Sequence, residues 1–151
     1  MHYNSRMDQY TLSHNTALKL IRQIRTGYAS KNFIENEDTI DILINTKNSR
    51  HKSNYINYHV CTYKLPRNSI KEYGDIKYVC PELLIVQMST VLETPLLALL
   101  ILEFCGTYCI NEVEHTFTSN LEPITSITKI KTYINSLCHL NNKVNGAKKL
   151  K

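Results

Sequence analysis

The chain has 151 residues, enough to bury the core of one domain. Its hydrophobic content of 42% and charged content of 21% are typical of a soluble globular protein. The formal net charge is +5, from 18 Lys and Arg against 13 Asp and Glu, which argues against a ribosomal or histone-like protein. This mild excess permits contact with nucleic-acid phosphates without requiring it.

The first predicted element is a helix preceded by a polar lead-in over residues 1–12. Ser13 is a typical N-cap, and Gly27 is a typical residue for the end of the helix. Between them the apolar residues have helical spacing, namely Ala17, Leu18, Ile21 and Ile24. Basic side chains fall off this apolar face, so they are predicted to be solvated or to contact phosphates.

Strands are predicted next, from alternation and from β-branched and aromatic residues. Residues 39–46 place Ile40, Ile42 and Ile44 on one side, and residues 55–65 form a second strand after a polar loop. A short hairpin is predicted at 70–73 and 76–79, turning at Gly74.

The densest apolar run, residues 78–110, is predicted to form a central helical hairpin. Pro81 and Pro95 mark the two starts, since proline suits a first helical position. They divide the run into helices of about 13 and about ten residues. Gly106 is expected to end the second helix with a positive φ. The run is predicted to be core, Leu99 included.

This run is not predicted to cross a membrane. A spanning helix needs about 20 consecutive apolar residues, whereas Glu93 and Glu103 enclose only nine positions.

Residues 111–123 are expected to be irregular, and Ser126 is expected to cap a last helix that ends before residues 141–145. The predicted fold class is α+β, with an N-terminal helix, a small mixed or antiparallel sheet, the helical hairpin and a C-terminal helix. We expect a single domain over residues 13–145 and a connection to a further domain beginning at 146–151.

Five cysteines, an odd number, are most simply free thiols in a cytoplasmic protein. Cys105, Cys109 and His115 do not have the paired spacing of a structural zinc site, so no metal and no cofactor is predicted.

Catalytic motifs are weak, so the chain is not predicted to be an enzyme. A phosphate-binding glycine loop, a serine nucleophile elbow and a His-Glu-x-x-His pair are missing from the sequence. Asp41 on a strand is the one candidate for a metal-dependent nuclease. The nearby Asp75-Ile76-Lys77 falls at a hairpin turn rather than on a paired strand.

Several segments resemble a family of uncharacterised bacterial proteins with the layout of abortive-infection type IV antitoxins. The matching residues are Ser13–Leu18, Arg22, Arg50, His59-Val60, Leu65-Pro66, Ser69, Val79–Leu83, Gln87-Met88 and Glu103–Tyr108. Cys80 departs from the serine cap expected there. In that family a domain resembling very-short-patch-repair endonucleases follows, and its nuclease residues have no counterpart here. The resemblance assigns no role to His14, His59, Pro81, Glu82, Glu103, Cys105, Gly106 and Tyr108.

These observations favour a non-catalytic, nucleic-acid-associated or regulatory module, which the resemblance implies is a truncated or stand-alone N-terminal part of an antitoxin- or endonuclease-like protein. Weak DNA binding through phosphates is expected at Lys19, Arg22, Arg25, Arg50 and Lys52, with His51 beside them. The alternative is a protein-interaction module whose apolar hairpin docks a toxin or nuclease chain. A metal-dependent nuclease is the third hypothesis.

Overall fold

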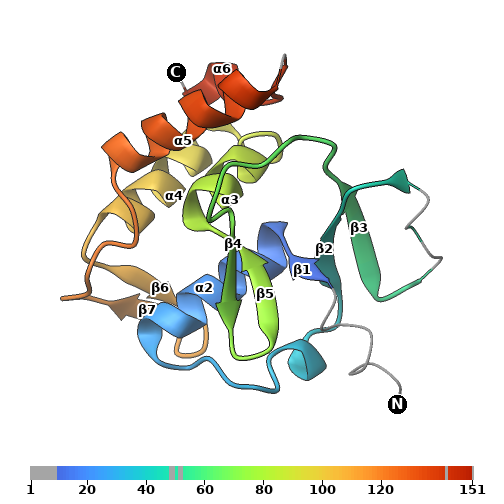
Figure 1. Ribbon diagram of the computed structural model, residues 1–151. Coiled ribbons are helices and arrows are strands. Elements are labelled where there is room, and N and C mark those ends of the chain that lie inside the picture. Colours follow the sequence, from blue (N-terminus) through green and yellow to red (C-terminus); the bar gives the residue numbers. More distant parts are fainter. Residues whose placement is uncertain (1–9, 48–49, 51–52, 142, 151) are drawn as a thin grey trace.

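The structure is a computed structural model that describes residues 10–47, 50, 53–141 and 143–150. Helices gather above and behind one end of a sheet, and a small hairpin stands apart from it (Figure 1). The strands are β1 (Thr11–Leu12), β2 (Ile40–Ile44), β3 (Ile56–Val60), β4 (Ile70–Tyr73), β5 (Ile76–Val79), β6 (Cys109–Asn111) and β7 (Thr116–Thr118). The helices are α2 (His14–Thr26), the 3-10 helix η1 (Ile34–Asn36), α3 (Pro81–Met88), α4 (Thr94–Cys105), α5 (Ile127–Leu140) and α6 (Ala147–Leu150).

The main sheet is mixed and has the strand order β3-β2-β1-β5-β4. Its central strand, β1, is parallel to β5 and antiparallel to β2. The predicted α+β class is confirmed, but this central strand lies in what we expected to be a polar lead-in. Two residues are too few to show alternation, and only the buried Leu12, 1% exposed, anchors them in the core.

The alternating strand predicted at 39–46 is confirmed as β2. Ile40, Ile42 and Ile44 are all buried, and Asp41 and Leu43 face the other side. β2 pairs in parallel with β3, with Asp41 opposite Asn57. The prediction for β3 was too long, since the strand covers five residues of the predicted 55–65.

The predicted hairpin is confirmed as β4 and β5, which pair antiparallel. Gly74 has φ +58° at the turn, a conformation that glycine adopts without steric cost.

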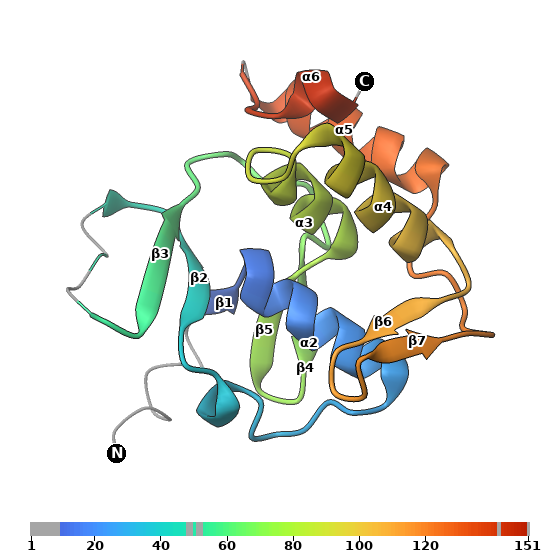
Figure 2. The ribbon, with the colours of Figure 1, turned by 180° about the vertical axis from the view of Figure 1, so that it is seen from behind.

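Helix α2 lies across one face of the sheet (Figure 2). It buries Ala17, Leu18, Leu20 and Ile21. Its predicted end is confirmed, because Gly27 has φ 83° and closes the helix in the left-handed conformation.

The central helical hairpin is confirmed as α3 and α4, but the lengths differ from those predicted. Helix α3 has eight residues and is buried almost all round, whereas α4 has 12 residues and is buried on one side only. Its buried side carries Leu97, Leu100 and Phe104. The prediction that Leu99 is core is wrong, since Leu99 is 58% exposed.

Gly106 does not end α4 with a positive φ, as we expected; its φ is −97° and its ψ −179°. Glycine is required there for space. A Cβ atom would lie 2.7 Å from the backbone oxygen of Leu102.

The segment predicted to be irregular contains the antiparallel hairpin β6–β7, whose strands have only three residues each. The predicted last helix is confirmed as α5, and the Ser126 hydroxyl caps it by accepting from the Lys129 N–H at 3.2 Å. Helix α6 then returns to the turn after α3, where Lys149 Nζ donates to the carbonyl oxygens of Ser89 and Leu92.

Across the described residues, no helix combines the length and apolar character needed to traverse a bilayer.

Candidate functional site

Most residues singled out by the sequence gather in two places. One is a buried polar network between α2, the end of α4 and β6. The other is an open cleft beside the N-terminal end of α2, which we call the histidine cleft. The charged side chains of the buried network have hydrogen-bond partners, whereas the histidine cleft contains polar atoms that no hydrogen bond of the described residues engages.

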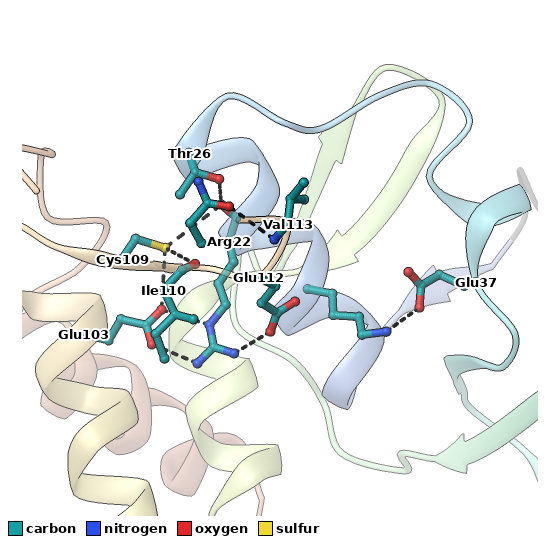
Figure 3. A network of polar contacts seen from close by, with 10 residues as sticks. Arg22, Thr26, Glu37, Glu103, Cys109, Ile110, Glu112 and Val113 are labelled. Carbon is teal, nitrogen blue, oxygen red and sulfur yellow. Dashed lines mark hydrogen bonds and ion pairs between the residues drawn. The ribbon is translucent and has the colours of Figure 1, made fainter. Parts of the chain in front are cut away.

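Arg22 and Glu103 form the centre of the buried network (Figure 3). Arg22 donates to both carboxylate oxygens of Glu103, at 2.8 and 2.9 Å, and to Glu112 Oε1 at 2.7 Å. The side chain of Glu103 is only 3% exposed and that of Arg22 14% exposed. Planar, two-point pairing of this kind is among the strongest polar contacts in proteins.

Burial alone would lower the pKa of Arg22, but hydrogen bonds and charges from Glu103 and Glu112 outweigh it and raise the pKa. The neighbouring thiol of Cys109 donates to Glu103 Oε2 at 3.5 Å. Burial and the Glu103 charge raise the pKa of Cys109 to about 11, so it is an inert thiol. This network is structural.

Arg25 completes the network by donating to four backbone carbonyl groups. They belong to Glu103, Gly106, Tyr108 and Glu122. These bonds tie the end of α4 and the following loops to α2. Glu103, Gly106 and Tyr108, which the sequence analysis singled out without a role, therefore serve one structural junction.

The expectation of an exposed basic face on α2 is wrong for Arg22 and Arg25. Both guanidinium groups point into the molecule, because the end of α4 and the loops that flank β6 and follow β7 supply acceptors to α2. Lys19 is the exception: its side chain is 47% exposed, although Nζ pairs with Glu37 at 2.8 Å. Phosphate contact through Arg22 or Arg25 would require breaking these internal bonds.

Of the predicted loop residues, Arg50 is described and is exposed. The predictions at His51 and Lys52 lie outside the described residues.

Pro81 and Glu82 lie at the start of α3, and Cys105 lies at the end of α4. Pro81 follows the N-cap Cys80, whose sulfur accepts from the Leu83 N–H at 3.4 Å, so the thiol stands in for the expected serine. Glu82 accepts from the Thr125 hydroxyl at 2.9 Å. Cys105, at the end of α4, is half-buried and free. The first two contacts cap α3 and tie it to the segment before α5.

The histidine cleft brings together His14 and His59, which are 45 positions apart in the chain. Their rings stack at 3.7 Å between centroids and 17° between planes. His59 Nε2 lies 2.8 Å from Asp41 Oδ1. The other Asp41 oxygen accepts from the Thr16 hydroxyl at 3.2 Å, which ties β2 and β3 to α2.

His14 is held in an unusual conformation, with φ 49° at the first residue of α2. Its Nδ1 lies 3.0 Å from the hydroxyl of buried Ser13. A positive φ at a non-glycine residue costs energy, and such residues are frequent at functional sites.

His14 and Asp41 both have a lowered pKa, but for different physical reasons. Burial and the neighbouring His59, opposed by Asp41, lower the pKa of His14 to about 4, so His14 is neutral near pH 7. Burial would raise the pKa of Asp41, but hydrogen bonds and charge from His59 outweigh it and lower the pKa. Asp41 is therefore a carboxylate held behind His59.

The cleft has a volume of about 380 Å³. Its polar lining includes His14, His59, Arg50 and Gln87, and its floor includes Leu83 and Val86 of α3. Among the described lining residues none is acidic. No hydrogen bond within the described structure engages His14 Nε2 or His59 Nδ1. The cleft thus offers unused polar groups, unlike the buried network.

A metal ion is not supported by the described side chains, which contain no cluster of three or more His, Cys, Asp or Glu suited to one. Both Asp41 oxygens already accept hydrogen bonds.

The sequence singled out His14 and His59 but did not predict that their rings stack. One signal was present, because residues two apart on a strand share a face, and Asn57 and His59 of β3 both contact Asp41. A comparison with protein families, curated proteins and solved structures found no match for this chain.

Proposed function

We propose that this chain is a non-catalytic, nucleic-acid-associated module that holds a backbone phosphate in the histidine cleft. The observation that carries this proposal is the stacked pair His14 and His59 facing the same cleft as Arg50. We include in this proposal the resemblance of the chain to the N-terminal part of antitoxin-like proteins.

The charges of the cleft favour an anion. Arg50 is a permanent cation, and guanidinium groups match phosphate geometry. The amino end of α2 adds partial positive charge: its first turn contains no acidic residue, and Ser13 makes no side-chain cap. The Asp41 carboxylate fixes the position of the His59 ring, because His59 Nε2 lies 2.8 Å from Asp41 Oδ1.

The sequence predicted phosphate contacts on the basic face of α2, whereas the proposal places the phosphate in the histidine cleft. Arg22 and Arg25 are bonded internally. Among the described residues predicted to contact phosphate, Arg50 is the one that lies beside other anion-binding groups. We expect weak, sequence-tolerant and salt-sensitive binding, with a dissociation constant on the order of 10–100 μM at physiological salt.

Fluorescence anisotropy with labelled single-stranded and duplex DNA, at 50 and 200 mM salt, tests this. Arg50→Ala should flatten the slope of log affinity against log salt by about one unit, the share of one phosphate. His59→Gln, which keeps a hydrogen-bonding side chain beside Asp41, should weaken binding at both salt concentrations. Lys131→Ala, an exposed change on α5, is the matched control and should bind like the parent.

Equal binding by Arg50→Ala and the parent would overturn the proposal, as would no binding at 50 mM salt. The nuclease hypothesis is tested in the same samples with magnesium or manganese. We expect intact DNA, and cleavage that disappears in Asp41→Ala would establish the nuclease instead.

A second candidate function, a module that docks another protein chain, is favoured by a separate observation. Helix α4 exposes three leucines, Leu96, Leu99 and Leu102, each more than half exposed.

A further inference from the structure

The histidine cleft is larger than a phosphate group needs. Its volume is about 380 Å³. A water molecule takes about 30 Å³ of liquid, and a phosphate group is only a few times larger. Cavities of about 300–1,000 Å³ are the usual size for whole small-molecule ligands. A phosphate held at Arg50 therefore leaves most of the cleft for another part of the same ligand.

Much of the remaining lining is apolar. Leu83 and Val86 on the floor are 2% and 4% exposed, and the half-buried Leu43 and Val60 line the cleft with them. A charged group would lose hydration against these side chains without gaining a partner. The second part of the ligand must therefore be largely uncharged and able to lie against an apolar surface.

Aromatic rings give the cleft flat faces. Tyr58 and Tyr63 line it together with the stacked rings of His14 and His59. Nucleobases that are not paired stack on Tyr and His side chains, because both partners are planar. A base is thus an uncharged, flat group that fits this lining.

Two side-chain amides supply hydrogen bonds for the edge of a base. Gln87 Oε1 accepts from the His14 N–H at 3.4 Å, while no hydrogen bond among the described residues uses the amide nitrogen of Gln87. Asn145 also lines the cleft, and its backbone N–H donates to the Tyr63 hydroxyl at 2.9 Å. Side-chain amides both donate and accept hydrogen bonds, as the edges of nucleobases do.

We propose that the histidine cleft takes one unpaired nucleotide of a single-stranded nucleic acid. Its base lies against the apolar and aromatic lining, and its phosphate lies at Arg50. This inference rests on the proposed function and names the ligand of the same site. Bases in a duplex are stacked and paired, so they cannot enter a cleft. The chain should therefore prefer single strands, although a duplex has the higher charge density.

An abasic strand separates base binding from phosphate binding, because it keeps every phosphate and lacks the bases. Fluorescence anisotropy compares a labelled single strand of DNA with an abasic strand of the same length and with the duplex, at one salt concentration. The parent should bind the intact strand about tenfold more tightly than the abasic strand, the effect of one stacked base. It should also bind the intact strand more tightly than the duplex. A parallel titration with RNA of the same sequence identifies which nucleic acid supplies the nucleotide.

Variants locate the base in the cleft. Gln87→Met removes the amide and keeps a side chain of similar length on α3. It should lower the ratio of intact to abasic affinity by about two- to tenfold, the effect of one hydrogen bond. Asn145→Ala, at an exposed position, is a second variant with the same expected direction. Gln23→Met, the same change on α2 outside the cleft lining, is the matched control and should keep the parent's ratio.

Equal affinity of the parent for intact and abasic strands would overturn this inference and leave the phosphate proposal standing, because the phosphates are the same in both. Absence of binding to either strand would overturn both proposals. A ratio that neither Gln87→Met nor Asn145→Ala changes would show that the bases contact another surface. Displacement of the strand by an equal molar concentration of free mononucleotide would overturn the single strand as the source of the nucleotide.

Discussion

The guanidinium group of Arg22 holds both carboxylate oxygens of Glu103, although the two residues are 81 positions apart. The pair joins the first helix to the end of the central hairpin. Removing one partner of a buried pair leaves a charge without compensation, which is more costly than losing the contact itself.

We therefore expect Arg22→Ala to destabilise the fold by about 3–5 kcal/mol, because Glu103 would stay buried without its partner. Lys19→Ala removes a partly exposed ion pair from the same helix and should cost no more than about 1 kcal/mol. Urea unfolding of both variants provides the measurement. Equal midpoints for the two variants would show that the Arg22 pair is not a structural centre.

The exposure of α4 predicts opposite results for two neighbouring leucines. Leu100→Asp should abolish folding, since Leu100 is 4% exposed and a buried unpaired charge costs several kcal/mol, comparable to total stability. Leu99→Asp should fold, since Leu99 is 58% exposed. Thermal melts of both proteins distinguish them. Unfolded Leu99→Asp would mean that α4 is buried on both sides.

Gly106 should not tolerate a methyl group. Its Cβ would lie 2.7 Å from the Leu102 backbone oxygen, which the helix holds in place. We expect Gly106→Ala to cost about 1–3 kcal/mol, the usual range for forced overpacking. Gly74→Asn is the control, because its site has nothing within 4 Å and asparagine tolerates a positive φ. Similar melting temperatures for both variants would contradict the steric explanation.

The low pKa of His14 predicts a loss of stability in mild acid. Its pKa is 6.5 ordinarily and about 4 in the folded chain, so between these values only the unfolded chain binds the proton. The free energy of unfolding should fall as pH drops from about 6.5 to about 4. Allowing for partial solvent exposure, we expect about 1–2 kcal/mol.

His14→Asn isolates this effect, because asparagine accepts the positive φ and does not titrate. Unfolding in urea at pH 7 and pH 4.5 is compared for both proteins. Asp41 also has a lowered pKa, but its contribution is lost at still lower pH and is present in both proteins. An identical pH dependence would show that His14 titrates normally.

The sequence by itself determined the elements whose signals are local. Alternation of isoleucines located β2, glycines located the hairpin turn and the end of α2, and prolines located the starts of α3 and α4. Ser126 located the start of α5. Each of these signals acts over a few residues, through backbone conformation or side-chain periodicity.

Only the tertiary structure decided which surfaces are covered. Arg22 and Arg25 lie off the apolar face of their helix, as solvated residues do. In the fold, however, they bond to Glu103 and to backbone carbonyl groups that are distant in the sequence. Leu99 carries the pattern of a core residue, yet nothing in the described chain packs over it. The partnership of His14, His59 and Asp41 likewise joins separate elements. Helical spacing fixes which residues share a face, but the packing of other elements decides what that face meets.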